Sequence, residues 1–124
     1  MGYVIVDTSS ILFGFANRRS VFEAVAAELA GRCLVSKGII NELNTISKSK
    51  GTRGAQAGAA LRELSLKRIK VEANSKYPDS WIKERAAGAG VTAVVTNDTK
   101  LAAAITKEVE VFKLSREGKL RRFR

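Results

Sequence analysis

Short apolar segments of strand type alternate with helix-forming segments along nearly the whole chain, and this alternation limits the possible folds more than any other feature. The first segment, residues 3–6, is brief and β-branched, and the turn-prone Thr8, Ser9 and Ser10 follow it, which favours a buried strand over a helix. Comparable segments lie at 33–35, 69–71, 91–96 and 109–114. The segment 91–96 is almost wholly apolar and therefore predicts a central strand.

Helices are expected between these strands. Ser20 and Glu23 form a capping-box pattern, and apolar residues at helical spacing follow them until Gly31. The predicted helices cover residues 20–29, 36–46, 55–66, 78–87 and 98–107. Strands that alternate with helices indicate a parallel sheet covered on both faces. We therefore expect an α/β fold, a three-layer α/β/α sandwich around a central, mainly parallel five-stranded sheet.

The length of the chain fits one domain. It has 124 residues, 45% of them apolar and 27% charged, which is enough to bury one core and leaves no room for two. We expect a single domain over residues 1–124, with a basic C-terminal tail from about residue 115.

The residue inventory excludes several kinds of catalysis. The sequence contains no His, so it offers no Ser-His-Asp triad, no imidazole base and no His-ligated zinc. Cys33 is the only cysteine, which fits a reducing intracellular setting. No apolar run approaches the roughly 18 residues that span a bilayer. We expect a cytoplasmic protein without a membrane partner.

Basic residues are concentrated in two stretches of a chain whose formal net charge is +10. Residues 44–70 carry seven Lys and Arg against one acidic residue, and residues 113–124 carry six against one. Such surfaces favour a polyanion such as RNA, because each phosphate contact releases counterions. A solvated helix face with a frayed tail is the alternative. The residues predicted to contact RNA are Lys48, Lys50, Arg53, Arg62, Arg121 and Arg122.

Four carboxylates occur where they could meet. Asp7 and Asp98 follow predicted strands, and the carboxyl ends of neighbouring parallel strands line one edge of a sheet. Asp79 lies at the start of the predicted helix 78–87. Glu42 lies in the predicted helix 36–46, at the margin of its apolar stripe. Carboxylates brought this close repel one another unless a cation offsets their charge. Oxygen ligands without His or Cys suit a hard ion, Mg²⁺ or Mn²⁺.

Each of these carboxylates also has an ordinary structural explanation. Asp79 and Asp98 stand where a helix N-cap would stand, and Asp is a favourable capping residue. Glu42 could be a partly exposed helical residue. Asp7 is harder to explain in this way, because Ser20 is the better cap for the helix that follows.

Several short motifs, taken together in their order, resemble those of the PIN-domain nucleases. The resemblance spans nearly the whole chain and is strongest to the Fcf1-like group that processes ribosomal RNA and to the VapC-type toxin nucleases. Its markers are residues 4–9 (VIVDTS), 41–43 (NEL), 79–82 (DSWI), 95–98 (VTND) and Leu101.

The resemblance implies a catalytic metal site. In the family, the residues that match Asp7, Glu42, Asp79 and Asp98 bind one or two divalent cations. The implied reaction is hydrolysis of RNA phosphodiester bonds by a metal-activated water, which needs no His.

Hydroxyl groups near this site have two interpretations. Ser9 and Thr96 would orient the metal ligands, or they are ordinary turn and strand-end hydroxyls. Many relatives carry a further acidic residue shortly after the position of Asp98, whereas Thr99 and Lys100 follow here. That departure bears on a second metal ion more than on the first.

Other functions and partners stay open. The chain could be an RNA-binding or ribosome-assembly factor with weak or no turnover, or a toxin nuclease neutralised by an antitoxin-like protein. The region of Phe13, Phe15 and Phe22 could support a homodimer or could fill the core. Tyr77, Trp81 and the Phe residues are too scattered in the sequence to predict a platform for base stacking.

Overall fold

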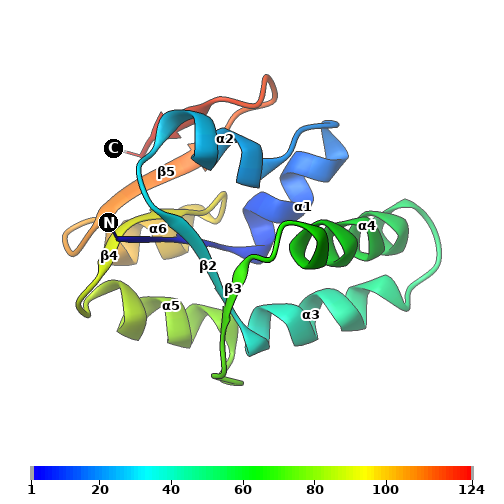
Figure 1. Cartoon of the computed structure of the whole chain (residues 1–124), viewed down its shortest axis with the longest axis horizontal. Helices are drawn as coiled ribbons and strands as arrows, with labels where there is room; N and C mark the ends of the chain where they lie inside the picture. Colours follow the sequence, from blue (N-terminus) through cyan, green and yellow to red (C-terminus); the bar gives the residue numbers. More distant parts are fainter. Residues whose placement is uncertain (1, 124) are drawn as a thin grey trace.

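The computed structural model describes residues 2–123 as a central sheet covered by helices (Figure 1). The strands are β1 (Tyr3–Val6), β2 (Arg32–Ser36), β3 (Lys70–Glu72), β4 (Val91–Val95), β5 (Glu110–Leu114) and β6 (Leu120–Arg122). The helices are α1 (Thr8–Ala16), α2 (Val21–Glu28), α3 (Lys37–Ser47), α4 (Thr52–Leu66), α5 (Pro78–Ala86) and α6 (Thr99–Ile105). The α/β fold and the mainly parallel sheet are confirmed.

The order of strands in the sheet is β3-β2-β1-β4-β5-β6, and every pair is parallel except β5 and β6. From β1 the chain proceeds outward to β2 and β3, and it then returns to the other side of β1 to form β4 and β5. The order therefore reverses between β1 and β4. In open parallel sheets, ligands bind at the carboxyl ends of the strands at such a switch point.

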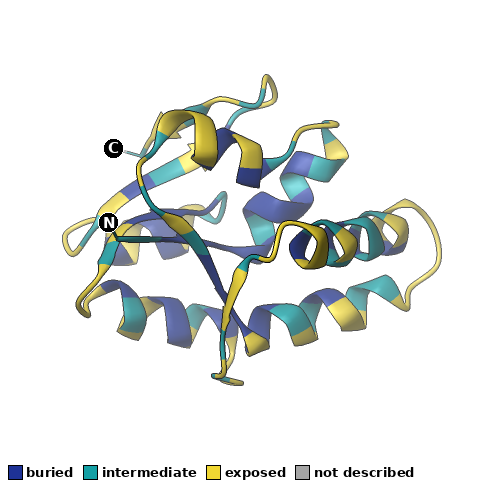
Figure 2. Cartoon of the chain, viewed as in Figure 1, coloured by how far each residue is buried: buried dark blue, intermediate teal, exposed yellow. Residues whose placement is uncertain are grey.

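The core lies around the two strands at this switch point. Val4, Ile5 and Val6 of β1 and the last three residues of β4 are buried, as the dark strands in Figure 2 show. Helices α1, α3 and α4 pack against one another, and α5 packs with α6. Because crossovers between parallel strands are right-handed as a rule, the reversal of strand order assigns α5 and α6 to the opposite face of the sheet from the other four helices. No helix within residues 2–123 is long and apolar enough to cross a membrane.

Helix α1 corrects the expectation of a turn at residues 8–10. The amides of Ser10 and Ile11 donate to the backbone oxygen of Asp7, at 3.1 Å each, and start the helix directly after β1. Its inner face, which includes Ile11 and Leu12, is buried in the core. Burial of this face stabilises the helix although its first residues have turn-forming side chains.

The sixth strand corrects the prediction of five strands and of a C-terminal tail. Residues 120–122 pair antiparallel with β5, and the connecting turn contains Gly118 at a φ of +83°. Leu120 and Phe123 pack against the core. Basic residues outnumber apolar residues in this short segment, and for that reason the sequence predicted a tail instead of a strand.

The helix N-terminus expected at Ser20 is present, and Ser36, which the sequence did not single out as a cap, has the same role. Ser20 caps α2 by accepting a hydrogen bond from the Glu23 amide at 3.3 Å, and Ser36 caps α3 through the Ile39 amide at 3.2 Å. Pro78 occupies the first turn of α5, where its missing N–H costs no helical hydrogen bond.

Candidate active site

The sheet topology brings two of the predicted carboxylates to the switch point. Asp7 follows β1, Asp98 follows β4, and the Asp7 amide donates to the Val95 oxygen at 3.0 Å across the two strands. Glu42 comes from the second turn of α3, and Asp79 from the first turn of α5. All four carboxylates line the same small cleft, which has a volume of about 170 Å³. The remaining lining residues are Thr8, Ser9, Leu12, Ile46, Arg53 and Tyr77.

Asp7 is the buried member of the set, with 4% of its surface exposed. Its Oδ2 atom accepts hydrogen bonds from Ser9 Oγ and Thr96 Oγ1, both at 2.7 Å. Burial raises the pKa of Asp7, and the negative charge of Asp79 adds to this rise, whereas the two hydroxyl groups oppose it. The site therefore holds a carboxylate whose negative charge would be stabilised by a nearby cation.

Asp98 combines the capping role with a place in the cleft. Its Oδ1 atom accepts from the Lys100 and Leu101 amides at 3.0 and 3.2 Å, so the capping interpretation of Asp98 holds in the structure. This capping uses one carboxylate oxygen and leaves Oδ2 for another partner. The backbone amide of Asp98 also donates to Thr96 Oγ1 at 3.1 Å, which links it to the Asp7 network.

Asp79 does not cap its helix. Tyr77 holds the N-cap position of α5 without a side-chain cap, and Asp79 is the second residue of the helix. Within residues 2–123, neither Asp79 nor Glu42 forms a side-chain hydrogen bond or ion pair. Hydrogen bonds thus fix the side chains of Asp7 and Asp98 and place no such restraint on those of Asp79 and Glu42.

Ser9 and Thr96 hold the buried carboxylate in place. Their hydroxyl oxygens lie 3.2 Å apart as they contact Asp7, and Ser9 Oγ also accepts from the Asn97 amide at 3.0 Å. Both hydroxyls thus position Asp7, and this contact favours the orienting role over an incidental one. Their role toward a metal ion stays a prediction.

The donor set fits a hard divalent cation, because the four acidic groups of the cleft all offer carboxylate oxygens, although Arg53 brings one positive charge to the same lining. In the described part of the chain, no three acidic side chains are already gathered as ligands of one ion. The four carboxylates therefore share one cleft without being gathered around a single point in it.

The basic residues predicted to contact RNA divide into two groups. Arg53 lines the carboxylate cleft, and Lys48 and Lys50 are exposed in the loop between α3 and α4 that leads to it. The other three are separate from this cleft. Arg121 and Arg122 lie on β6, where Arg122 pairs with Glu110 at 3.1 Å, and Arg62 lies on α4 at another cavity.

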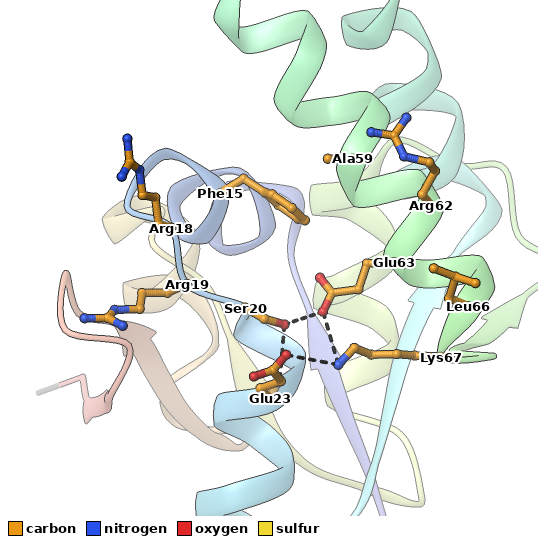
Figure 3. Close-up of a pocket in the computed structure, with 10 residues that line it drawn as sticks. All are labelled: Phe15, Arg18, Arg19, Ser20, Glu23, Ala59, Arg62, Glu63, Leu66 and Lys67. Carbon is orange, nitrogen blue, oxygen red and sulfur yellow. Dashed lines mark hydrogen bonds and ion pairs between the residues drawn. The ribbon is translucent and has the colours of Figure 1, made fainter.

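That other cavity is the larger one, with a volume of about 560 Å³, and it lies where α2 begins and α4 ends (Figure 3). None of the four carboxylates lines it. Four of its seven polar or charged lining residues pair with one another. Lys67 lies 3.4 Å from Glu23 and 3.3 Å from Glu63, and Ser20 donates a hydrogen bond to Glu63. This internal pairing, and a lining that includes none of the four carboxylates, make it the weaker candidate site.

Two residues with a place at the site were not found from the sequence. The Asn97 side chain bonds the backbone of Leu114 and accepts from Ser10 Oγ at 2.7 Å, so it fixes the end of β4. An amide side chain directly after an apolar strand was the available signal. Tyr77 lines the cleft and is 67% exposed. No sequence signal could have identified it, because its position beside Glu42 depends on the tertiary fold.

Comparisons with known proteins agree with this architecture. A family model described as PIN like domain matches residues 4–117. A solved structure entitled "Structure of the PIN domain endonuclease Utp24" superposes with a TM-score of 0.79 at 24% sequence identity, over 98% of this chain and 91% of that chain. This likeness shows a shared fold. No curated protein sequence matches the chain at a significant level.

Proposed function

The chain belongs to the PIN-like domain family, and on that premise we propose that it is a divalent-metal-dependent endoribonuclease. The observation that carries the proposal is that four carboxylates from four separate segments line one cleft at the switch point of the sheet. The proposed ligands of Mg²⁺ or Mn²⁺ are Asp7, Glu42, Asp79 and Asp98. The endonuclease with the similar fold adds support to a nuclease assignment.

The residues of the chain would divide the work of binding and positioning. Asp7 and Asp98 provide fixed oxygens, because hydrogen bonds already hold each of them. Glu42 and Asp79 would complete the ligand set. When bound, a divalent cation supplies a water of lowered pKa and stabilises charge on the phosphate, so no His is required.

RNA would be held by the basic residues on one side of the cleft. Arg53 lines the cleft and can contact a phosphate group there, and Lys48 and Lys50 extend the positive surface along the preceding loop. The high net charge supports a polyanionic substrate, because counterion release favours binding to basic proteins.

A non-catalytic RNA-binding protein is the second candidate. Arg53 favours it, because a guanidinium group in the cleft offsets part of the carboxylate charge without a metal ion. Turnover separates the two candidates.

The test is cleavage of a labelled RNA by the wild type and by Asp98→Asn, each with Mn²⁺, Mg²⁺ or EDTA. Asn still offers an oxygen to cap α6, so the variant removes charge while keeping the cap. Glu108→Gln is the matched control, because Glu108 is exposed, carries the same charge and lies outside the cleft.

We expect cleavage by the wild type and by Glu108→Gln only with metal. Asp98→Asn should lose more than the roughly 10–100-fold in activity that removing an outer partner of a metal site costs. Equal cleavage by Asp98→Asn would refute the proposed site. Salt-sensitive RNA binding by every variant without any cleavage would favour the non-catalytic candidate.

A further inference from the structure

A second cavity adjoins the carboxylate cleft. It has a volume of about 350 Å³ and lies between α3 and the segment that leads into α5. It shares Glu42 and Tyr77 with the cleft, so a group bound in one space lies next to a group bound in the other. The other lining residues are Gly38, Asn41, Thr45, Ser75, Lys76 and Pro78.

Tyr77 gives this cavity an exposed aromatic wall. Among the described residues, three large apolar or aromatic side chains are exposed, namely Leu66, Val71 and Tyr77. Tyr77 alone of these lines the carboxylate cleft. An aromatic ring that is 67% exposed beside a proposed phosphate site is suited to stacking on an unpaired base.

Gly38 allows the segment before α5 to approach α3 closely enough to place Tyr77 at this cavity. A side-chain carbon at this position of α3 would collide with the backbone oxygen of Lys76. The Gly38 amide instead donates to the Asn74 oxygen at 3.0 Å, which holds the segment before α5 against the helix. This close approach places Tyr77 beside the polar side of α3.

The charges of the cavity favour a neutral ligand over a phosphate group. Lys76 is the one basic residue that lines it, and its Nζ atom contacts both oxygens of Glu84, at 3.0 and 2.9 Å. Glu42 adds a negative charge at the boundary with the cleft. An anion would therefore be repelled, whereas a neutral base would not.

Neutral polar groups are available to contact such a base. Within residues 2–123, the exposed side-chain amide of Asn41 forms no hydrogen bond, so both its donor and its acceptor are free. The hydroxyl of Thr45 donates to the Asn41 backbone oxygen at 3.0 Å and keeps its acceptor capacity. An amide that both donates and accepts can read the edge of a base.

We propose that this cavity binds one unpaired nucleobase of the RNA substrate, which stacks on Tyr77 and is contacted by Asn41. The proposal rests on the proposed function and adds to it the two side chains, Tyr77 and Asn41, that would hold an unpaired base beside the cleft. A paired base would already be stacked within its duplex and could not enter the cavity.

Binding in EDTA tests this without requiring cleavage. Fluorescence anisotropy would compare a labelled 12-nucleotide single-stranded RNA with a duplex of the same sequence, for the wild type, Tyr77→Ala and Tyr77→Phe. Leu66→Ala is the matched control, because Leu66 is 83% exposed and lies outside both spaces. Thermal unfolding of each variant checks that the fold is unchanged.

We expect Tyr77→Ala to weaken single-strand binding about tenfold or more, within the roughly 5- to 150-fold range that loss of one base stack implies. Tyr77→Phe and Leu66→Ala should bind as the wild type does, and duplex binding should not change. Asn41→Ala should alter the nucleotide preference beside the cut.

Three results would overturn the subsite. They are single-strand binding by Tyr77→Ala within twofold of the wild type, an equal loss in Tyr77→Phe, or an equal loss on the duplex. If the wild type cleaves RNA and one of these results is found, the subsite alone fails. If the wild type binds neither RNA in EDTA and also cleaves neither RNA with Mn²⁺, the proposed function fails with it.

Discussion

The substitution Asn97→Ala should destabilise the protein more than an ordinary surface change, because the side chain continues the sheet beyond the end of β4. Asn97 Nδ2 donates to the Leu114 oxygen and Oδ1 accepts from the Leu114 amide, both at 3.0 Å. Oδ1 also accepts from Ser10 Oγ at 2.7 Å. Leu114 and Ser10 are buried, so the substitution leaves three buried polar groups without these partners.

The expected loss follows from these three groups. A buried donor or acceptor that loses its partner costs roughly 1–3 kcal/mol. Taking the lower end for each group gives a decrease of about 3 kcal/mol in the free energy of unfolding. That is a large part of the roughly 5–15 kcal/mol that stabilises a typical domain, and it corresponds to a fall in Tm of roughly 10 °C for a chain of this size.

Unfolding in urea, monitored by tryptophan fluorescence, would measure this loss of stability. Trp81 is the only tryptophan in the sequence and is buried. Ser10→Ala removes only one of the three bonds and should cost about 1 kcal/mol. The double variant should lose less than the sum, because both single changes remove the same bond. A loss below about 1 kcal/mol for Asn97→Ala, or one no larger than that of Ser10→Ala, would refute this account of the β4 terminus.

Two further predictions concern other parts of the chain. Burial raises the pKa of Cys33 from 9.0 to about 11, so its thiolate fraction at pH 8 falls about 100-fold. Iodoacetamide should therefore label Cys33 about 100-fold more slowly in the folded protein than in the urea-unfolded protein. Equal labelling rates would contradict this burial. Replacing both Lys48 and Lys50 by Ala should lower the slope of log binding constant against log salt concentration for single-stranded RNA by about 1.4. Lys107→Ala, at the far end of α6 from Asp98, should leave that slope unchanged, and an unchanged slope in the double variant would place the RNA elsewhere.

The sequence was most informative where the chain is locally regular. Residues 91–96 are almost wholly apolar, and Ser20 with Glu23 forms a local capping pattern, so both features follow from neighbouring residues. The start of α1 does not, because Thr8, Ser9 and Ser10 have turn-forming side chains, whereas burial of residues such as Ile11 and Leu12 in the tertiary fold stabilises the helix. The strand β6 was not predicted either, because its basic residues obscured the pattern of a strand, and it is formed by pairing with β5.

The candidate site was predictable as a set of residues but not as an arrangement. Asp7 and Asp98 follow strands, and a parallel sheet aligns such ends, so their proximity could be expected. Sequence alone could not show that the cap on α6 uses one oxygen of Asp98, or that Tyr77 lies beside Glu42. Those features depend on how α3 and α5 pack, which no local pattern specifies.

Direct measurement of Mn²⁺ binding tests the central claim, that the four carboxylates form one site for a divalent cation. Titration of the wild type, Asp7→Asn and Glu108→Gln, followed by electron paramagnetic resonance of free Mn²⁺, would report affinity and stoichiometry in the absence of RNA. We predict at least one ion per chain in the wild type and in Glu108→Gln, and a loss of affinity of about 100-fold or more in Asp7→Asn. Equal binding by Asp7→Asn, or none by the wild type, would contradict the claim.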